Sequence, residues 1–95
     1  MVISTLTADE ALSRVGRGIH LLCFAQQKDV EQAKRLLEFF AKARSTNLIR
    51  VDPLEAATTF QLSRHPTFVL YCDGNERWQA LGIEELSNRT RQEVR

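Results

Sequence analysis

The sequence predicts a layered α/β fold, and three observations indicate this class. Residues 19–24 are an almost continuous apolar run of strand length, which is typical of a central strand covered on both faces. An amphipathic helical pattern then leads to a second short apolar run at residues 48–51, so we expect two parallel strands joined by a helical crossover. A third run at residues 67–72 ends at Asp73-Gly74, a dipeptide typical of hairpin turns.

The first predicted element is a helix that begins after Thr7. Thr7 and Glu10 have the spacing of a capping box, in which each side chain accepts a hydrogen bond from the other residue's backbone amide. The apolar stripe of this helix is Ala8, Ala11, Leu12 and Val15. Gly16 and Gly18 are expected to end it, because glycine tolerates the left-handed backbone found at helix ends.

The remaining elements follow in order along the chain. Residues 29–43 have an apolar position every three or four residues, which predicts the longest helix. The pattern Asp52-Pro53-Leu54-Glu55 is typical of a helix start and predicts a short helix with Ala56, Ala57 and Phe60 on its core face. Residues 77–81 are expected to return as the second strand of the hairpin. A final weak helix is predicted over residues 84–94, with Leu86, Thr90 and Val94 as its stripe.

Length and charge limit the classes of function. A chain of 95 residues is expected to form one domain over residues 1–95. The formal net charge is +1, so no overall field attracts nucleic acid or an anionic membrane. No run has the length of a membrane span, and the first seven residues lack a signal-peptide pattern. We therefore expect a cytoplasmic protein, with no nucleic-acid or membrane partner and with reduced cysteines.

Three short motifs resemble the thioredoxin family: His65-Pro66-Thr67, Asp73-Gly74 and Leu81-Gly82-Ile83. Their mutual spacings fit the family's proline, hairpin glycine and late glycine without a gap, and the likeness extends from Thr7 to Glu84. The resemblance implies a thioredoxin-like three-layer α/β/α sandwich. It also implies a mixed sheet of about four strands with a cis-proline, Pro66, before the third strand.

The same resemblance implies that the redox apparatus is absent. The family's two active-site cysteines fall on Lys28 and Glu31, its preceding tryptophan on Gln27, and its buried aspartate on Leu22. Lys28 and Glu31 cannot exchange disulfides, and Leu22 cannot accept the proton of a thiol. We therefore predict no enzyme of the dithiol–disulfide oxidoreductase class.

Two cysteines remain, and strand pairing is expected to keep them apart. If residues 67–72 run antiparallel to residues 19–24, Cys72 lies four or five positions from the partner of Cys23, or roughly 15 Å at about 3.3 Å per residue. A disulfide requires Cα atoms within about 7 Å. Cys23 is predicted to be an inert core residue, and Cys72 to be more exposed.

The resemblance implies a peptide-binding groove even without cysteines, because the backbone before the family's proline pairs with an extended substrate segment. Its rim, with Glu31 just behind, consists of Gln26, Gln27, Lys28, Asp29, Val30, Arg64, His65, Pro66, Gly82 and Ile83. The main hypothesis is a redox-inactive binding or adaptor module that recognises a protein partner. The alternatives are an ordinary solvated rim, a single-cysteine oxidoreductase working through Cys72, and a structural homodimer.

Other candidate sites are weaker. His20 and His65 are the only histidines, and no run supplies three metal ligands at a known spacing, so we predict no metal site and no cofactor. His20 is expected to be a hydrogen-bonded core histidine. Trp78 is predicted to cover the core beneath the last helix, with anchoring of a homodimer as the alternative.

Overall fold

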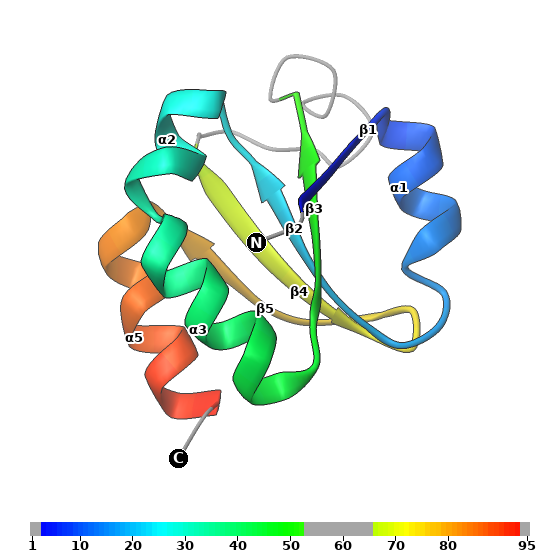
Figure 1. Cartoon of the computed structure of the whole chain (residues 1–95). Coiled ribbons are helices and arrows are strands. Elements are labelled where there is room, and N and C mark those ends of the chain that lie inside the picture. The colour runs from blue at the N-terminus through cyan, green and yellow to red at the C-terminus, as the bar shows by residue number, and fades with distance from the viewer. Residues whose placement is uncertain (1–2, 53–65, 94–95) are drawn as a thin grey trace.

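The computed structural model describes residues 3–52 and 66–93, which form a five-stranded sheet with helices on both faces (Figure 1). The sheet order is β1-β3-β2-β4-β5. The strands are β1 (Ile3–Leu6), β2 (Ile19–Phe24), β3 (Asn47–Val51), β4 (Thr67–Cys72) and β5 (Asn75–Leu81). β1, β3 and β2 pair in parallel, whereas β4 is antiparallel to both β2 and β5.

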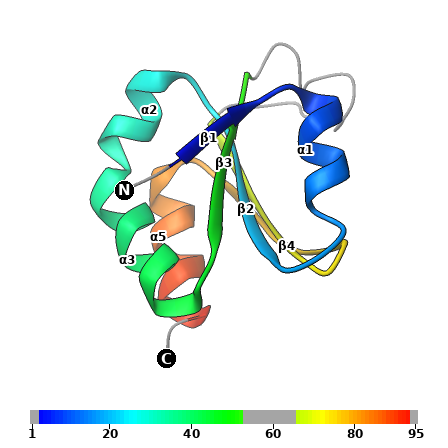
Figure 2. The same cartoon turned by 45° about the vertical axis from the view of Figure 1, so that its right-hand side comes forward.

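The helices make two layers, which confirms the predicted α/β/α sandwich. Helix α1 (Ala8–Arg14) lies on one face, and α2 (Gln27–Gln32), α3 (Lys34–Arg44) and α5 (Ile83–Glu93) lie on the other. Figure 2 shows the sheet between these two layers. The helix predicted from Asp52 falls mainly on residues 53–65, outside the described part of the chain.

β2 is buried on both faces, as its continuous apolar sequence predicts. Leu21 and Cys23 are fully buried in the cluster beneath α2, α3 and α5, while Leu22 and Phe24 are fully buried in the cluster beneath α1. Successive side chains of a strand point to opposite faces, so a strand in the middle of three layers needs an apolar residue at every position. β2 thereby forms part of two cores.

The prediction of about four strands is wrong, because β1 adds a fifth. Among the described strands, its four residues pair only with β3, from Ile3 opposite Leu48 to Leu6 opposite Val51. Ser4 and Thr5 are exposed at the sheet edge, so the strand lacks the alternation that reveals a half-buried strand in a sequence. Its stabilising partner lies more than 40 positions away along the chain, and no local pattern indicates it.

The long helix predicted over residues 29–43 is instead two helices, α2 and α3. They meet at Ala33, whose φ of −91° and ψ of 4° depart from the helical values. Ala33 is 2% exposed and still donates its backbone amide to Asp29. The sequence contains no proline or glycine here, and nothing in the structure explains the break.

The predicted helix start at Thr7 and the predicted hairpin turn are both confirmed. The Thr7 hydroxyl accepts from the Glu10 amide at 3.2 Å, and the Glu10 carboxylate accepts from the Thr7 amide at 3.0 Å. Asp73 and Gly74 have φ of 48° and 86°, the left-handed pair of a type I′ turn. The Asp73 carboxylate also accepts from the Gly18 amide at 2.8 Å, which ties the hairpin to the loop before β2.

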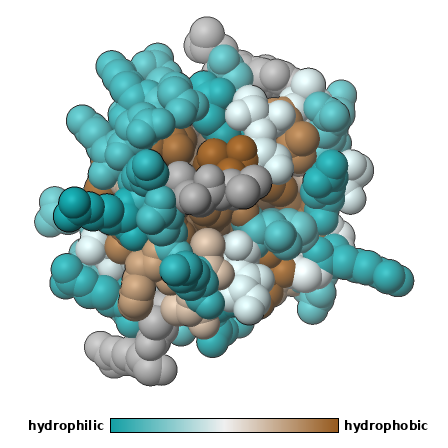
Figure 3. Space-filling view, in the orientation of Figure 1, coloured by the Kyte–Doolittle hydropathy of each residue, from teal (hydrophilic) through white to brown (hydrophobic). Residues whose placement is uncertain are grey.

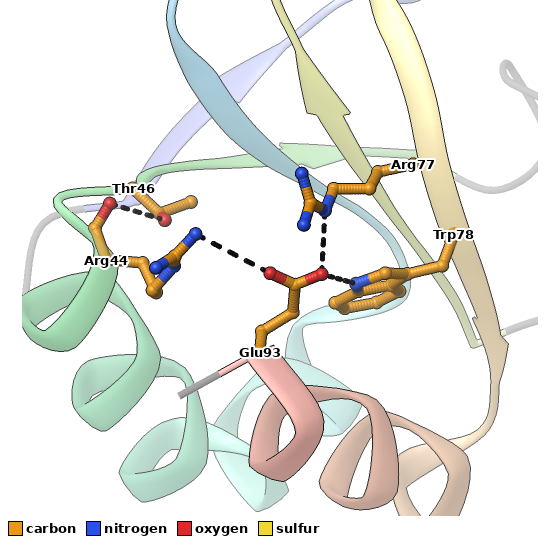
Figure 4. Close-up of polar contacts among 5 residues, drawn as sticks. All are labelled: Arg44, Thr46, Arg77, Trp78 and Glu93. Carbon is orange, nitrogen blue, oxygen red and sulfur yellow. Dashed lines mark hydrogen bonds and ion pairs between the residues drawn. The ribbon is translucent and has the colours of Figure 1, made fainter. Parts of the chain in front are cut away.

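Trp78 is a core residue, as predicted, and it connects three elements. Its side chain is 8% exposed and meets the ring of Phe40 edge-on, with centroids 6.2 Å apart. The indole nitrogen donates to Glu93 of α5 at 3.2 Å, and Arg77 donates to the same oxygen at 2.7 Å (Figure 4). Arg44 of α3 lies 3.7 Å from the other Glu93 oxygen. Glu93 therefore holds α3, β5 and α5 together.

A bulge in β5 produces this arrangement. Leu70 pairs with Trp78, but the next pair is Tyr71 with Glu76, so Arg77 is the extra residue on the bulged strand. A bulge of this kind changes the direction of a side chain locally. Arg77 reaches Glu93, while Trp78 remains on the face that carries the core beneath α3 and α5.

Candidate functional site

The structure brings the ends of three strands, β2, β4 and β5, together at one end of the sheet. Phe24 of β2 pairs with Thr67 of β4, and Thr67 pairs with Leu81 of β5. The residues that follow Phe24 and Leu81, and the one that precedes Thr67, therefore lie side by side. The Gly82 amide donates to the Pro66 carbonyl oxygen at 2.9 Å, which connects two of these strand ends directly. We call this end of the sheet, together with the start of α2, the rim.

The start of α2 supplies the polar part of the rim. Gln26 has extended backbone and is the N-cap of α2, and its carbonyl oxygen accepts from the Asp29 and Val30 amides at 3.0 and 3.2 Å. Gln27 and Lys28 occupy the first turn and are exposed. The Gln27 side chain donates to Glu31 at 3.0 Å, so that carboxylate lies on the exposed side of α2, behind the rim.

The opposite part of the rim is less polar. Pro66, Gly82 and Ile83 are half-buried, and Ile83 packs against the core cluster beneath α5. Gly82 has a φ of 92°, in the region that side chains rarely adopt, which explains a glycine between β5 and α5. The rim thus combines an amide-rich helix start with a small apolar wall.

Not every residue predicted for the rim is found there. Val30 is 1% exposed and belongs to the core, so it supports α2 from beneath and offers no contact surface. Arg64 and His65 lie outside the described residues, as does the peptide bond before Pro66 on which the cis-proline prediction rests.

Sequence reasoning missed Leu81, which is 42% exposed at the end of β5 beside the rim. Its backbone amide donates to Glu85 at 3.2 Å, and a shallow hollow of about 210 Å³ is lined by Leu81, Glu84, Glu85 and Asn88. The exposure of Leu81 could have been predicted from the sequence. Trp78 and Ala80 occupy the buried face of β5, so Leu81 falls at an outward position.

The three positions that the resemblance assigns to redox chemistry hold residues with other roles. Lys28 is exposed in the first turn of α2, and Glu31 is exposed near its end. Leu22 is 0% exposed and packs in the cluster that includes Ile49 and Val69, its neighbours on β3 and β4. In place of an acid, the central strand therefore carries a fully buried aliphatic residue.

Both cysteines are free thiols in the structure. Cys23 pairs with Phe68, and Cys72 lies four positions further along β4, as the predicted antiparallel pairing requires. Cys23 is fully buried, and loss of solvation raises its pKa to about 12. Cys72 is half-buried and lies close enough to Arg77 to contribute to the raised pKa of that guanidinium, after the larger effect of Glu93.

The buried thiol predicts a stability change at alkaline pH. Below pH 9, the Cys23 thiol is neutral in both the folded and the unfolded chain. Between about pH 9 and 12 only the unfolded thiol ionises, so the free energy of unfolding should fall by about 1.4 kcal/mol per pH unit. Urea unfolding at pH 8 to 11 should show this slope reduced in Cys23→Ala. The pKa of Tyr71 is also raised, first by burial and then by Glu76. Tyr71 is present in both proteins, so its effect cancels when the two slopes are compared. Equal slopes would contradict the burial of Cys23.

The described residues contain no other recognisable reaction centre. No group of three histidine, cysteine, aspartate or glutamate side chains in residues 3–52 and 66–93 is arranged to hold a metal ion. His20 is 8% exposed, and its Nε2 is hydrogen-bonded to the Arg17 carbonyl oxygen, which confirms the predicted core histidine. Within the same ranges, no helix has both the length and the apolar character to span a membrane.

The face seen in Figure 3 shows both hydrophilic and hydrophobic side chains. Hydrophilic side chains cover most of this view, which includes α3, and hydrophobic atoms show mainly around its middle. Phe39 of α3 is exposed at 55%, as a single apolar residue among charged neighbours. Isolated apolar residues of this kind are normal on protein surfaces.

Comparison with known proteins identifies the fold. No protein-family model and no curated protein matches the sequence. Among solved structures, the chain is similar to a cysteine-to-serine mutant of Entamoeba histolytica thioredoxin, with 15% identity and a TM-score of 0.74 over 99% of this chain and 100% of that one. It is also similar to oxidised Plasmodium falciparum thioredoxin, with 18% identity and a TM-score of 0.77 over 99% and 100% of the two chains.

A designed protein is similar to the same extent, with 20% identity and a TM-score of 0.78 over 99% of this chain and 98% of that one. At such identities the likeness concerns the fold and carries no activity across. The sequence itself contains two cysteines, 49 positions apart, and therefore no Cys-x-x-C. The chain has the thioredoxin-like fold without the sequence motif of dithiol chemistry.

Proposed function

We propose that this protein is a redox-inactive binding or adaptor module that recognises an extended segment of a protein partner at the rim. One observation carries the proposal. The strand ends that form the rim are present, and the Gly82 amide is hydrogen-bonded to the Pro66 carbonyl oxygen. Lys28 and Glu31, by contrast, occupy the positions that the resemblance assigns to the family's cysteines. The strand ends at the rim are therefore present without the two cysteine thiols that transfer electrons in the family.

Strand addition is the binding mode that suits this frame. An extended partner segment gains affinity from main-chain hydrogen bonds at a strand end and specificity from neighbouring side chains. Lys28 offers a positive charge at one side of the rim, and the exposed Leu81 offers an apolar contact near the other. From the sequence, Arg64 and His65 add positive charge next to Pro66. We infer that the partner segment carries acidic and apolar residues.

Reversal of the charge at Lys28 tests this proposal. Affinity capture from the native cell extract, with Lys28→Glu compared to the original chain, should lose at least nine-tenths of the specifically captured partner. Lys42→Glu makes the same charge change on exposed α3 and should leave capture within a factor of two. Both side chains are exposed, so the melting temperatures should agree within about 2 °C. Equal capture by Lys28→Glu and the original chain would overturn the rim as the binding site.

A single-cysteine oxidoreductase is the second candidate, because half-buried Cys72 lies beside the Arg77 guanidinium. The thiolate is the reactive form of a cysteine, so the rate of alkylation measures its reactivity. Alkylation of Cys23→Ala isolates this thiol, and a rate well above that of an ordinary thiol at the same pH would support the candidate. An ordinary rate, together with no reduction of insulin disulfides, would exclude it.

Trp78, the residue predicted to anchor a homodimer, is not available for that role. Trp78 is buried against Phe40 and is hydrogen-bonded to Glu93, so it cannot also fill a pocket of a second copy. A homodimer would need another surface. Sedimentation velocity at low protein concentration tests for one.

A further inference from the structure

A second candidate site lies on the opposite side of the sheet from α2, at the far end of β2 from the rim. It is a cavity of about 280 Å³ between α1 and three strands, which are seen together in Figure 2. The lining residues are Ser4, Arg14, His20, Asn47, Leu48 and Ile49. They come from β1, α1, β2 and β3, so the fold brings together residues that are distant in sequence.

The chemistry of the lining favours an anion. Arg14 supplies a positive charge, the Ser4 hydroxyl can donate a hydrogen bond, and no carboxylate is among the described residues that line the cavity. The Asn47 amide uses one N–H for the Ile19 carbonyl oxygen, at 3.4 Å, and has a second N–H to donate. The nearest acid along α1, Glu10, is hydrogen-bonded to Thr7 at the helix start, and the Arg14 charge adds a smaller effect that also lowers the pKa of Glu10.

His20 is the most buried polar residue of the lining. Its ring is 8% exposed, and Nε2 must carry the hydrogen because the Arg17 carbonyl oxygen can only accept. The other ring nitrogen, Nδ1, is buried and has no hydrogen-bond partner within residues 3–52 and 66–93. Buried polar atoms nearly always have a protein or water partner.

We propose that this cavity binds a small oxyanion, carried by a phosphate or a carboxylate group. Arg14 provides the opposite charge, and Ser4 and Asn47 donate hydrogen bonds from the sheet. The volume is at the lower end of the roughly 300–1,000 Å³ of small-molecule pockets, so the ligand is small.

An NMR titration of the full chain tests the site. Inorganic phosphate and acetate are added in separate series at constant ionic strength, and backbone amide shifts are followed. Saturable changes centred on Ser4, Arg14, His20 and Asn47 are expected. Tighter binding of phosphate would assign a phosphate group, and tighter binding of acetate a carboxylate. Absence of saturation with both anions, or changes centred on other residues, would overturn the proposal.

Matched variants separate a built site from general charge attraction. Arg14→Gln should weaken binding at least tenfold, because hydrogen bonds to charged groups are among the stronger ones. Arg35→Gln makes the same charge change on exposed α3 and should stay within a factor of two. Ser4→Ala should weaken binding about threefold or more. Equal losses in Arg14→Gln and Arg35→Gln would contradict the site, because net charge alone would then explain the binding.

Discussion

Replacing Leu22 by aspartate, the residue that the thioredoxin resemblance places there, should lower the free energy of unfolding by about 4 kcal/mol or more. Leu22 is fully buried, and the described residues clustered around it are all apolar, among them Phe24, Ile49 and Val69. The substitution removes aliphatic contacts and buries a carboxyl group with no partner in that cluster. A domain of this size has a total stability of roughly 5–14 kcal/mol, so a large fraction would be lost.

Urea unfolding of Leu22→Asp at pH 5 and pH 8 measures this loss. The loss should be larger at pH 8, because burial raises the pKa of a carboxyl group and the unfolded chain is the better solvated state for the anion. Leu22→Met, which keeps the volume, should cost less than about 1.5 kcal/mol. A loss below 1 kcal/mol in Leu22→Asp would mean that this strand still accommodates an acid.

Replacing Trp78 by alanine should destabilise the fold by about 3–5 kcal/mol. The change leaves a cavity beside Phe40 and removes the indole hydrogen bond to Glu93, so it loosens the contact between α5 and the sheet. Far-UV circular dichroism during chemical unfolding measures the effect. It is the appropriate probe because Trp78 is the only tryptophan.

Arg77→Gln is the control for that substitution. It removes the neighbouring ion pair to Glu93 but leaves Trp78 in place, and the Arg77 side chain is 52% exposed. Pairs this exposed contribute about 1 kcal/mol or less. A cost for Arg77→Gln similar to that for Trp78→Ala would show that the ion pair, and not the aromatic packing, holds α5.

Elements with strong local signals were predictable from the sequence. The unbroken apolar residues of β2, the capping box at Thr7 and the Asp73-Gly74 turn each have a local physical cause, and the structure contains all three. β1 could not be predicted in this way, because its only partner is β3 and its two central residues are exposed. The break at Ala33 has no sequence signal at all.

The candidate site was predictable only in part. Strand register places the residues around Gln26, Pro66 and Gly82 together. Their role as a binding groove stays a prediction of the resemblance. Periodicity correctly makes Val30 an apolar position of a helix, but it could not show that α2 turns this side chain fully into the core. The cavity at Ser4, Arg14 and His20 was beyond sequence analysis, because it depends on β1 and on strand pairings between distant segments.

The rim and the cavity lie at opposite ends of β2, so variants can examine each without altering the other. Lys28 follows the end of β2, whereas His20 is near its beginning. Arg14→Gln should therefore leave partner capture unchanged, and Lys28→Glu should leave anion binding unchanged. The two proposals can fail independently.

Binding of a partner segment at the rim is tested most directly by a map of amide chemical-shift changes. The map compares this protein alone with its complex with the binding segment of the captured partner. We expect the largest shift changes at Gln26, Gln27, Lys28, Thr67 and Gly82, with no dithiol–disulfide exchange at any stage. Changes confined to α3 or to the β1 edge would contradict it, because the partner would then bind away from the strand ends that the fold retains.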